Sequence, residues 1–165
     1  MAREILFKAK RTDNGEWVEG YLVKCRTSEE EGYAIKDTVY HVNDGIINLI
    51  PCVVDESTIC QYTGLTDKNG NKIWENDVLF QKTTEKHWCQ WECMGVVKYG
   101  VHDWNELDYG YTSIRFFVEP IVKKGDKNKI VCGLNQIDVN DEFYPIEVIG
   151  NIFDNPELLG GADNG

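Results

Sequence analysis

Residues 55–80 constrain the fold of this chain more than any other segment. Short apolar pairs alternate there with polar turn residues, which gather in Asp67-Lys68-Asn69-Gly70 and again in Glu75-Asn76-Asp77. Asp, Asn and Gly favour tight turns because they accept backbone conformations that other residues avoid. Apolar runs this short are typical of strands. The segment therefore predicts two tight turns between short strands.

Similar short runs recur along the whole chain. A hairpin is predicted over residues 5–23, with Asn14 and Gly15 supplying the positive φ values of a primed turn. Helical structure is predicted at only two places, a single turn capped by Asp55 and a terminal helix at residues 152–159 with Asn155 as its cap. Further strands are predicted at residues 33–35, 38–42, 46–50, 77–82, 95–99, 113–122, 129–132 and 144–149.

This spacing predicts an all-β, mainly antiparallel protein with minor helical turns. We expect a small N-terminal β part at residues 1–60 and a junction at 61–75. Residues 76–159 hold five of the expected strands, enough for a small SH3-like β-barrel. Residues 160–165 are expected to form a disordered tail.

Charge argues against a nucleic-acid binder. The 165 residues include 17 Lys and Arg against 28 Asp and Glu, a formal net charge of −11. Such a field repels phosphate backbones, so we expect no direct DNA or RNA binding. The one basic cluster, Lys123, Lys124, Lys127 and Lys129, is interpreted as an exposed hairpin tip. The acidity serves either solubility or the attraction of a basic partner.

The sequence predicts a cytoplasmic protein. Its longest apolar run, residues 46–54, contains Asn48 and Pro51 and is too short to span a bilayer. No apolar segment of a signal peptide follows Met1, so neither secretion nor membrane insertion is expected. The six cysteines are therefore predicted to be reduced and mostly buried.

His87, Cys89 and Cys93 form the most tempting metal-ligand set. On an extended strand they would share one face, and zinc would need a fourth ligand such as Cys132 or His102. No familiar ligand spacing is present, so packing is the favoured role. We expect no metal, no cofactor and no disulfide.

Three other groups have two interpretations each. Gln61–Gly64 is either a ligand-facing loop or a structural anchor, and the density of turn residues favours the anchor. The aromatic residues of the second half suit either an interface or a barrel core. They are Trp88, Trp91, Trp104, Tyr109 and Tyr111. Asp103, Glu106 and Asp108 could act together as carboxylates, but a solvated loop is the favoured interpretation.

Familiar catalytic motifs are absent from the sequence. Ser28, Ser57 and Ser113 lie in no G-x-S-x-G setting, and no Walker loop, dinucleotide fingerprint or H-E-x-x-H occurs. We therefore nominate no catalytic, cofactor-binding or metal-binding residue, and we expect a non-enzyme.

Several separate motifs, taken together and in order, resemble the YopX family of phage and prophage proteins. They are residues 7–9, 17–21, 61–65, 67–70, 73, 75–78, 95–97, 147–152 and 155–159. Two positions depart from the family pattern. Cys60 stands where a small residue is usual, and Asn76 stands where Gly usually precedes the aspartate. Because Asn tolerates positive φ, we expect the turn at Asn76 to survive.

The resemblance implies a two-part β protein in the cytoplasm of a bacterial host, with no established molecular function. We predict an accessory protein that acts as a protein-interaction module, with an unidentified host or phage protein as partner. Self-association through an exposed strand edge is also expected. The alternative is a hydrolase or small-ligand-binding protein with an unfamiliar site.

Overall fold

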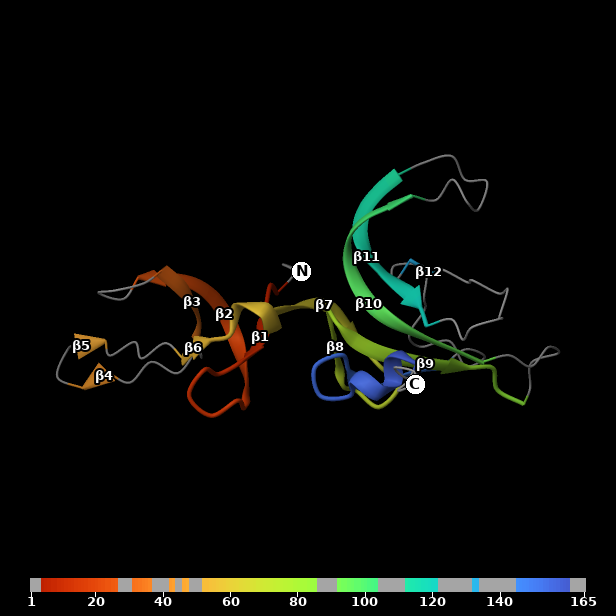
Figure 1. The fold of residues 1–165 in the computed structure, drawn as a ribbon, viewed down its shortest axis with the longest axis horizontal. Coiled ribbons are helices and arrows are strands. Elements are labelled where there is room, and N and C mark those ends of the chain that lie inside the picture. Colours follow the sequence, from red (N-terminus) through yellow and green to blue (C-terminus); the bar gives the residue numbers. More distant parts are fainter. Residues whose placement is uncertain are drawn as a thin grey trace, which may run out of the picture. The chain divides into compact units, whose positions relative to one another are not determined.

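The structure is a computed structural model of the chain, and Figure 1 shows its strands. It describes residues 4–26, 31–36, 42–43, 46–47, 52–85, 92–103, 112–121, 132–133 and 145–160. The chain forms two compact units, residues 1–64 and residues 65–165.

The first unit is built from antiparallel strands. Its elements are β1 (Phe7–Lys10), β2 (Trp17–Arg26), β3 (Glu31–Lys36), β4 (Val42–Asn43), β5 (Ile46–Ile47), β6 (Cys52–Val54), the 3-10 turn η1 (Glu56–Thr58) and the start of β7 (Cys60–Thr66). The strands β6, β3, β2, β1 and β7 are neighbours in this order, whereas β4 and β5 form a separate pair.

The β1–β2 hairpin is present, but its turn differs from the prediction. Arg11 N–H donates to the Glu16 carbonyl at 2.9 Å, and Gly15 N–H donates to the Arg11 carbonyl at 3.0 Å. Only Gly15 has positive φ, at 73°, whereas a primed turn would also require it of Asn14. The connection is longer than two residues, so a single glycine suffices to turn the chain.

Strand β6 returns to the end of β1. Besides pairing with β3, it bonds to residues 10–12, where Thr12 N–H donates to the Val53 carbonyl at 3.1 Å. Asp55 N–H donates to the Lys10 carbonyl at 2.8 Å. Hydrogen bonds thus link β1, β2, β3 and β6 in a ring. Ala9, Ile35 and Val54 form its buried core.

The helical turn predicted after Asp55 is confirmed. Asp55 caps η1 by accepting the Ser57 N–H at 3.0 Å, and the Ser57 hydroxyl donates to the same oxygen at 2.7 Å. These bonds satisfy a donor at the start of the turn that would otherwise have no partner.

The second unit centres on a five-stranded antiparallel sheet. Its elements are the end of β7, β8 (Lys72–Trp74), β9 (Asp77–Lys82), β10 (Glu92–Asp103), β11 (Thr112–Pro120), β12 (Cys132–Gly133), β13 (Ile146–Asn151) and the 3-10 turn η4 (Pro156–Leu159). The sheet order is β12-β11-β10-β9-β13. Its core is formed by Ile73, Leu79, Val97, Phe116 and Ile146.

The C-terminal turn is shorter than the predicted helix. It begins at Pro156, with Asn155 at the cap position, but the Asn155 side chain makes no capping bond. Its Oδ1 instead accepts the Asn151 N–H at 3.3 Å, which ties the turn to the end of β13.

The prediction of a mainly antiparallel β protein is confirmed, and the helical structure of the described residues is limited to the two 3-10 turns. The SH3-like form of the second unit stays a prediction. None of the helices in the described ranges has the length and apolar character needed to cross a membrane.

Candidate functional site

Asp67 is the centre of the signature turn. This residue is only 5% exposed. One carboxylate oxygen accepts the N–H groups of Asn69 and Asn71, both at 2.8 Å. The other accepts the Asn71 amide and the Val148 N–H, both at 3.1 Å. Four donors thus converge on one buried carboxylate.

These donors also decide the charge state of Asp67. Burial raises the pKa of a carboxyl group, because it disfavours the charged form. The N–H of Val148, the side chain of Asn71 and the nearby backbone donors together lower it by more, so the Asp67 pKa lies below its ordinary value. Asp67 is therefore a stable anion that holds the turn.

The same turn closes one edge of the sheet. Lys68 N–H donates to the Ile146 carbonyl at 3.0 Å, and Asp67 accepts from Val148 two residues further along β13. An unpaired edge would offer these groups to another chain. The signature turn thus seals the side of β13 that faces away from β9.

The second signature turn joins β8 to β9. Asn76 has a φ of 66°, which confirms that asparagine supports the left-handed conformation there. Asp77 is 2% exposed, and its Oδ2 accepts the Trp74 N–H at 2.8 Å. Asn76 also bonds to both sides, donating to the Val97 carbonyl and accepting from Ile152. Both buried carboxylates of the signature thus stabilise turns.

Gln61–Gly64 lies in strand β7 and not in a loop. Tyr62 N–H donates to the Leu6 carbonyl at 2.9 Å, and Thr63 is buried. Leu65 packs against the core of the second unit. The segment therefore lacks the loop conformation that the ligand-binding interpretation requires.

Most other candidate residues lie outside the described ranges. These are His87, Trp88, Cys89, Trp91, Trp104, Glu106, Asp108, Tyr109, Tyr111, Lys123, Lys124, Lys127 and Lys129. Cys93 is half-buried on β10, whereas Cys60 is buried. His102 and Asp103 end β10, and Cys132 begins β12. Within the described ranges, no three metal-ligating side chains gather. The metal, cofactor and disulfide predictions remain untested.

An open strand edge lies on β10. Alternate residues of a strand direct their backbone groups to opposite neighbours. The Met94 carbonyl accepts from Ile121 on the β11 side, whereas the Val97 carbonyl accepts from Asn76 on the β9 side. By this alternation, Tyr99 and Val101 direct their N–H and C=O groups toward the β9 side.

Strand β9 does not reach these two residues. Its pairing with β10 ends where Val78 lies opposite Val96, and the chain turns away at Asn76. Among the described residues, none bonds to the backbone groups that Tyr99 and Val101 present on this side. We call these two residues and Gly100 between them the open edge.

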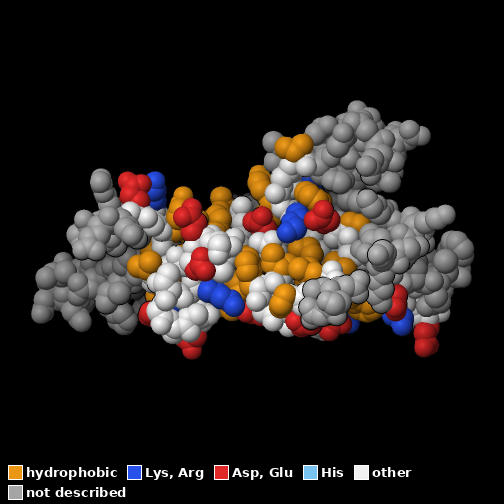
Figure 2. All heavy atoms as spheres, in the orientation of Figure 1, with side chains coloured by type: hydrophobic (Ala, Val, Ile, Leu, Met, Phe, Trp, Pro, Cys, Tyr) orange, Lys and Arg blue, Asp and Glu red, His pale blue; other side chains and the backbone are white. Residues whose placement is uncertain are grey.

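The side chains of the open edge are apolar and exposed. Tyr99 is 51% exposed and Val101 is 66% exposed, although both share a face of β10 with the buried Val97. Hydrophobic side chains show on the surface of the upper part of the β10–β11 hairpin (Figure 2). Sequence reasoning missed these residues. The alternation Val97, Tyr99, Val101 was a signal, but it does not tell buried positions from exposed ones.

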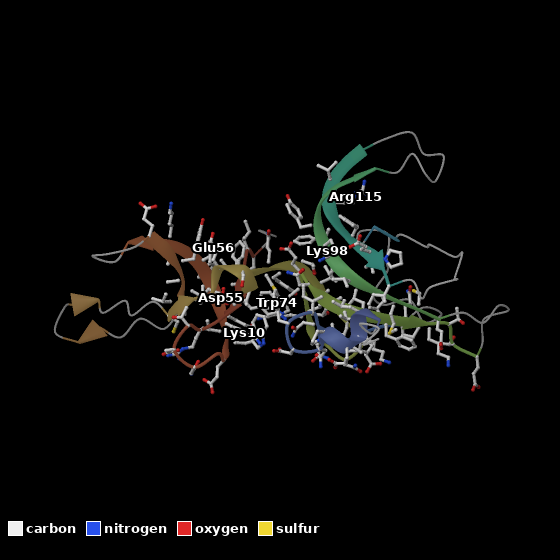
Figure 3. All side chains as sticks on the ribbon, viewed as in Figure 1. Lys10, Asp55, Glu56, Trp74, Lys98 and Arg115 are labelled. Atoms are coloured by element: carbon white, nitrogen blue, oxygen red, sulfur yellow. The ribbon has the colours of Figure 1, made fainter. Side chains whose placement is uncertain are left out.

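The opposite face of the hairpin is polar. Gly100 lies opposite Arg115, and Lys98 precedes Gly100 on the same face (Figure 3). Lys98 Nζ lies 3.3 Å from the Asn76 side-chain oxygen. An added strand would therefore meet apolar side chains on one face and basic ones on the other.

The comparisons with known proteins agree with this fold. The family described as YopX protein matches residues 6–160. The crystal structure of protein EF1440 from Enterococcus faecalis is 24% identical in sequence, with a TM-score of 0.51 over 96% of this chain and 99% of that chain. At this identity the likeness concerns the fold alone. No curated protein matches the chain. Because the family match spans nearly all residues, the chain belongs to the YopX protein family.

Proposed function

We propose that this chain is a protein-interaction module, carried by a phage or prophage, that captures a host or phage protein. The observation that supports it is the open edge of β10, where backbone groups to which no described residue bonds coincide with the exposed side chains of Tyr99 and Val101. An extended segment of another protein can add to such an edge as a further strand. Main-chain hydrogen bonds then supply affinity, and alternate side chains supply specificity.

The net charge of the whole chain favours a basic partner, and this attraction comes from the rest of the surface, because Lys98 and Arg115 make the polar face beside the open edge itself basic. The net charge of −11 attracts a positively charged protein and speeds its encounter with the chain. The signature carboxylates do not compete for this role, because Asp67 and Asp77 are buried and bonded to backbone N–H groups.

Affinity capture from a bacterial lysate tests the proposal when it is made with matched variants. Tyr99→Ser with Val101→Ser removes the apolar side chains of the open edge. Tyr21→Ser with Val53→Ser is the control, because this pair in the first unit is similarly exposed, at 43% and 44%. We expect wild type and control to retain the same partner, and the Tyr99 and Val101 variant to lose it.

Added salt should weaken this capture, because it screens opposite charges. Equal retention by all three proteins would overturn the proposal. Turnover in a broad hydrolase screen, with no partner retained by wild type, would favour the alternative of an enzyme.

A further inference from the structure

We infer that the open edge also pairs with its own copy, so that two chains form a two-fold dimer through β10. This inference deepens the proposed function, because it names a second occupant of the same edge.

The backbone of the open edge is self-complementary. Tyr99 and Val101 direct their N–H and C=O groups to the same side, with Gly100 between them. If two copies lie antiparallel with Gly100 on the two-fold axis, Tyr99 of each copy faces Val101 of the other. Residues that face each other this way exchange two hydrogen bonds. The two pairs then bond every backbone group that the edge presents.

The side chains match in the same register. Each pair places an aromatic ring beside a β-branched side chain on one face of the joined sheet, a favourable cross-strand combination. Tyr99 and Val101 would bury surface that is 51% and 66% exposed in the single chain. At Gly100 an added Cβ meets nothing within 4 Å, so neither strand is obstructed at the axis within its own chain.

The contact between the two copies buries little surface, so the dimer is weak. Two short strand segments bury far less than the roughly 1,600 Å² of a standard stable interface. Each copy also carries a net charge of −11, so the two chains repel. We therefore expect a weak dimer that forms at high protein concentration and becomes stronger as salt screens the repulsion.

The effect of added salt distinguishes binding of a basic partner from binding of a second copy. A basic partner binds less tightly when salt is added, whereas a second copy of this acidic chain binds more tightly. The two proposals can therefore fail independently. A chain that captures its partner but never dimerises refutes only this inference, and a chain that dimerises without capturing a partner refutes only the proposed function.

Cross-linking of Gly100→Cys tests the register. Residues that face each other across the axis without mutual hydrogen bonds have Cα atoms about 4.5 Å apart, within the range that a disulfide spans. Gly32→Cys is the control, because its added Cβ also meets nothing within 4 Å and it lies on β3 of the first unit. Under mild oxidation we expect a covalent dimer from Gly100→Cys, well above the amounts from Gly32→Cys and from wild type.

Sedimentation equilibrium tests the association itself. We expect wild type to dimerise at high concentration, and added salt to lower the dissociation constant. Val101→Pro removes an N–H from the open edge and should raise that constant by about tenfold or more, as expected from the loss of hydrogen bonds. Val101→Ala keeps the N–H and should have a smaller effect. Circular dichroism of each variant confirms that it is folded.

Three results would overturn the inference. The first is a monomer at all concentrations together with no excess cross-linking of Gly100→Cys. The second is a dimer that salt weakens. The third is a dimer that a folded Val101→Pro variant forms as well as wild type does.

Discussion

At the scale of single residues, the signature of this family serves the fold. Asp67 joins two parts of the second unit, because its carboxylate accepts from its own turn and from Val148 on β13. Asp77 fixes the next turn through the Trp74 N–H. A buried aspartate is often interpreted as catalytic, but here the bonds of both residues are those of a turn.

Asp67→Asn should destabilise the chain by about 1–3 kcal/mol, the cost of leaving buried polar groups unpaired. The side-chain amide of the variant would place an N–H donor where the Asn71 amide and the Val148 N–H now donate to Oδ2, so donors would face donors. Urea unfolding measures the loss. Asp13→Asn is the control, because Asp13 forms an exposed ion pair with Arg11 and should matter little. Equal effects of the two substitutions would contradict the role given to Asp67.

Acid should destabilise the folded chain in part by protonating the Asp67 carboxylate. Burial raises the Asp67 pKa and the hydrogen bonds lower it by more, so in the folded chain it lies below the ordinary value of 3.8. Its stabilisation is therefore complete above that value and is lost as pH falls through the folded pKa. Unfolding free energies measured from neutral pH downward should fall less steeply in Asp67→Asn than in wild type. Parallel pH curves would show that Asp67 is not the group involved.

At the scale of elements, close approach of two strands depends on one glycine. A Cβ at Gly95 would lie 2.8 Å from the Glu119 carbonyl oxygen and would also clash with Val118. Gly95→Ala should therefore cost about 1–3 kcal/mol, as overpacked substitutions do. Gly100→Ala in the same strand meets nothing within 4 Å and should be nearly neutral. Thermal unfolding of both variants measures the difference, and similar melting temperatures would refute the close approach.

Local patterns predicted some elements well. Strand β9 occupies Asp77–Lys82 as expected, because turn residues mark its start. Asn76 takes the positive φ that its place before Asp77 requires. In contrast, β10 was expected at residues 95–99 and extends over Glu92–Asp103, since pairing with β9 and β11 lengthens it. Such pairing joins distant segments and leaves no local signal.

The candidate site depends on distant segments as well. The turn at Asp67 is visible in the sequence, but its contact with Val148 spans 81 positions. The apolar alternation through Val97, Tyr99 and Val101 is visible too. The sequence does not show which of these side chains are buried. Val97 is covered, whereas Val101 lies beyond the end of β9 and is exposed.

At the scale of the whole molecule, each unit has its own core. Ile35 is fully buried in the first unit and Ile146 is 1% exposed in the second. Ile35→Ala should cost about 2–5 kcal/mol and speed amide exchange mainly in β1, β2 and β3. Ile146→Ala is the reciprocal variant and should act mainly on β9 and β13. Uniform acceleration by either variant would show that the two units unfold together.

Amide hydrogen exchange of the free chain tests the open edge of β10 most directly. The measurement uses dilute protein at low salt, where neither partner nor second copy is bound. We expect Tyr99 and Val101 to exchange fast, because their N–H groups face the open side. Lys98 and Gly100 direct theirs toward β11 and should exchange slowly. Equally slow exchange at all four residues would contradict an open edge.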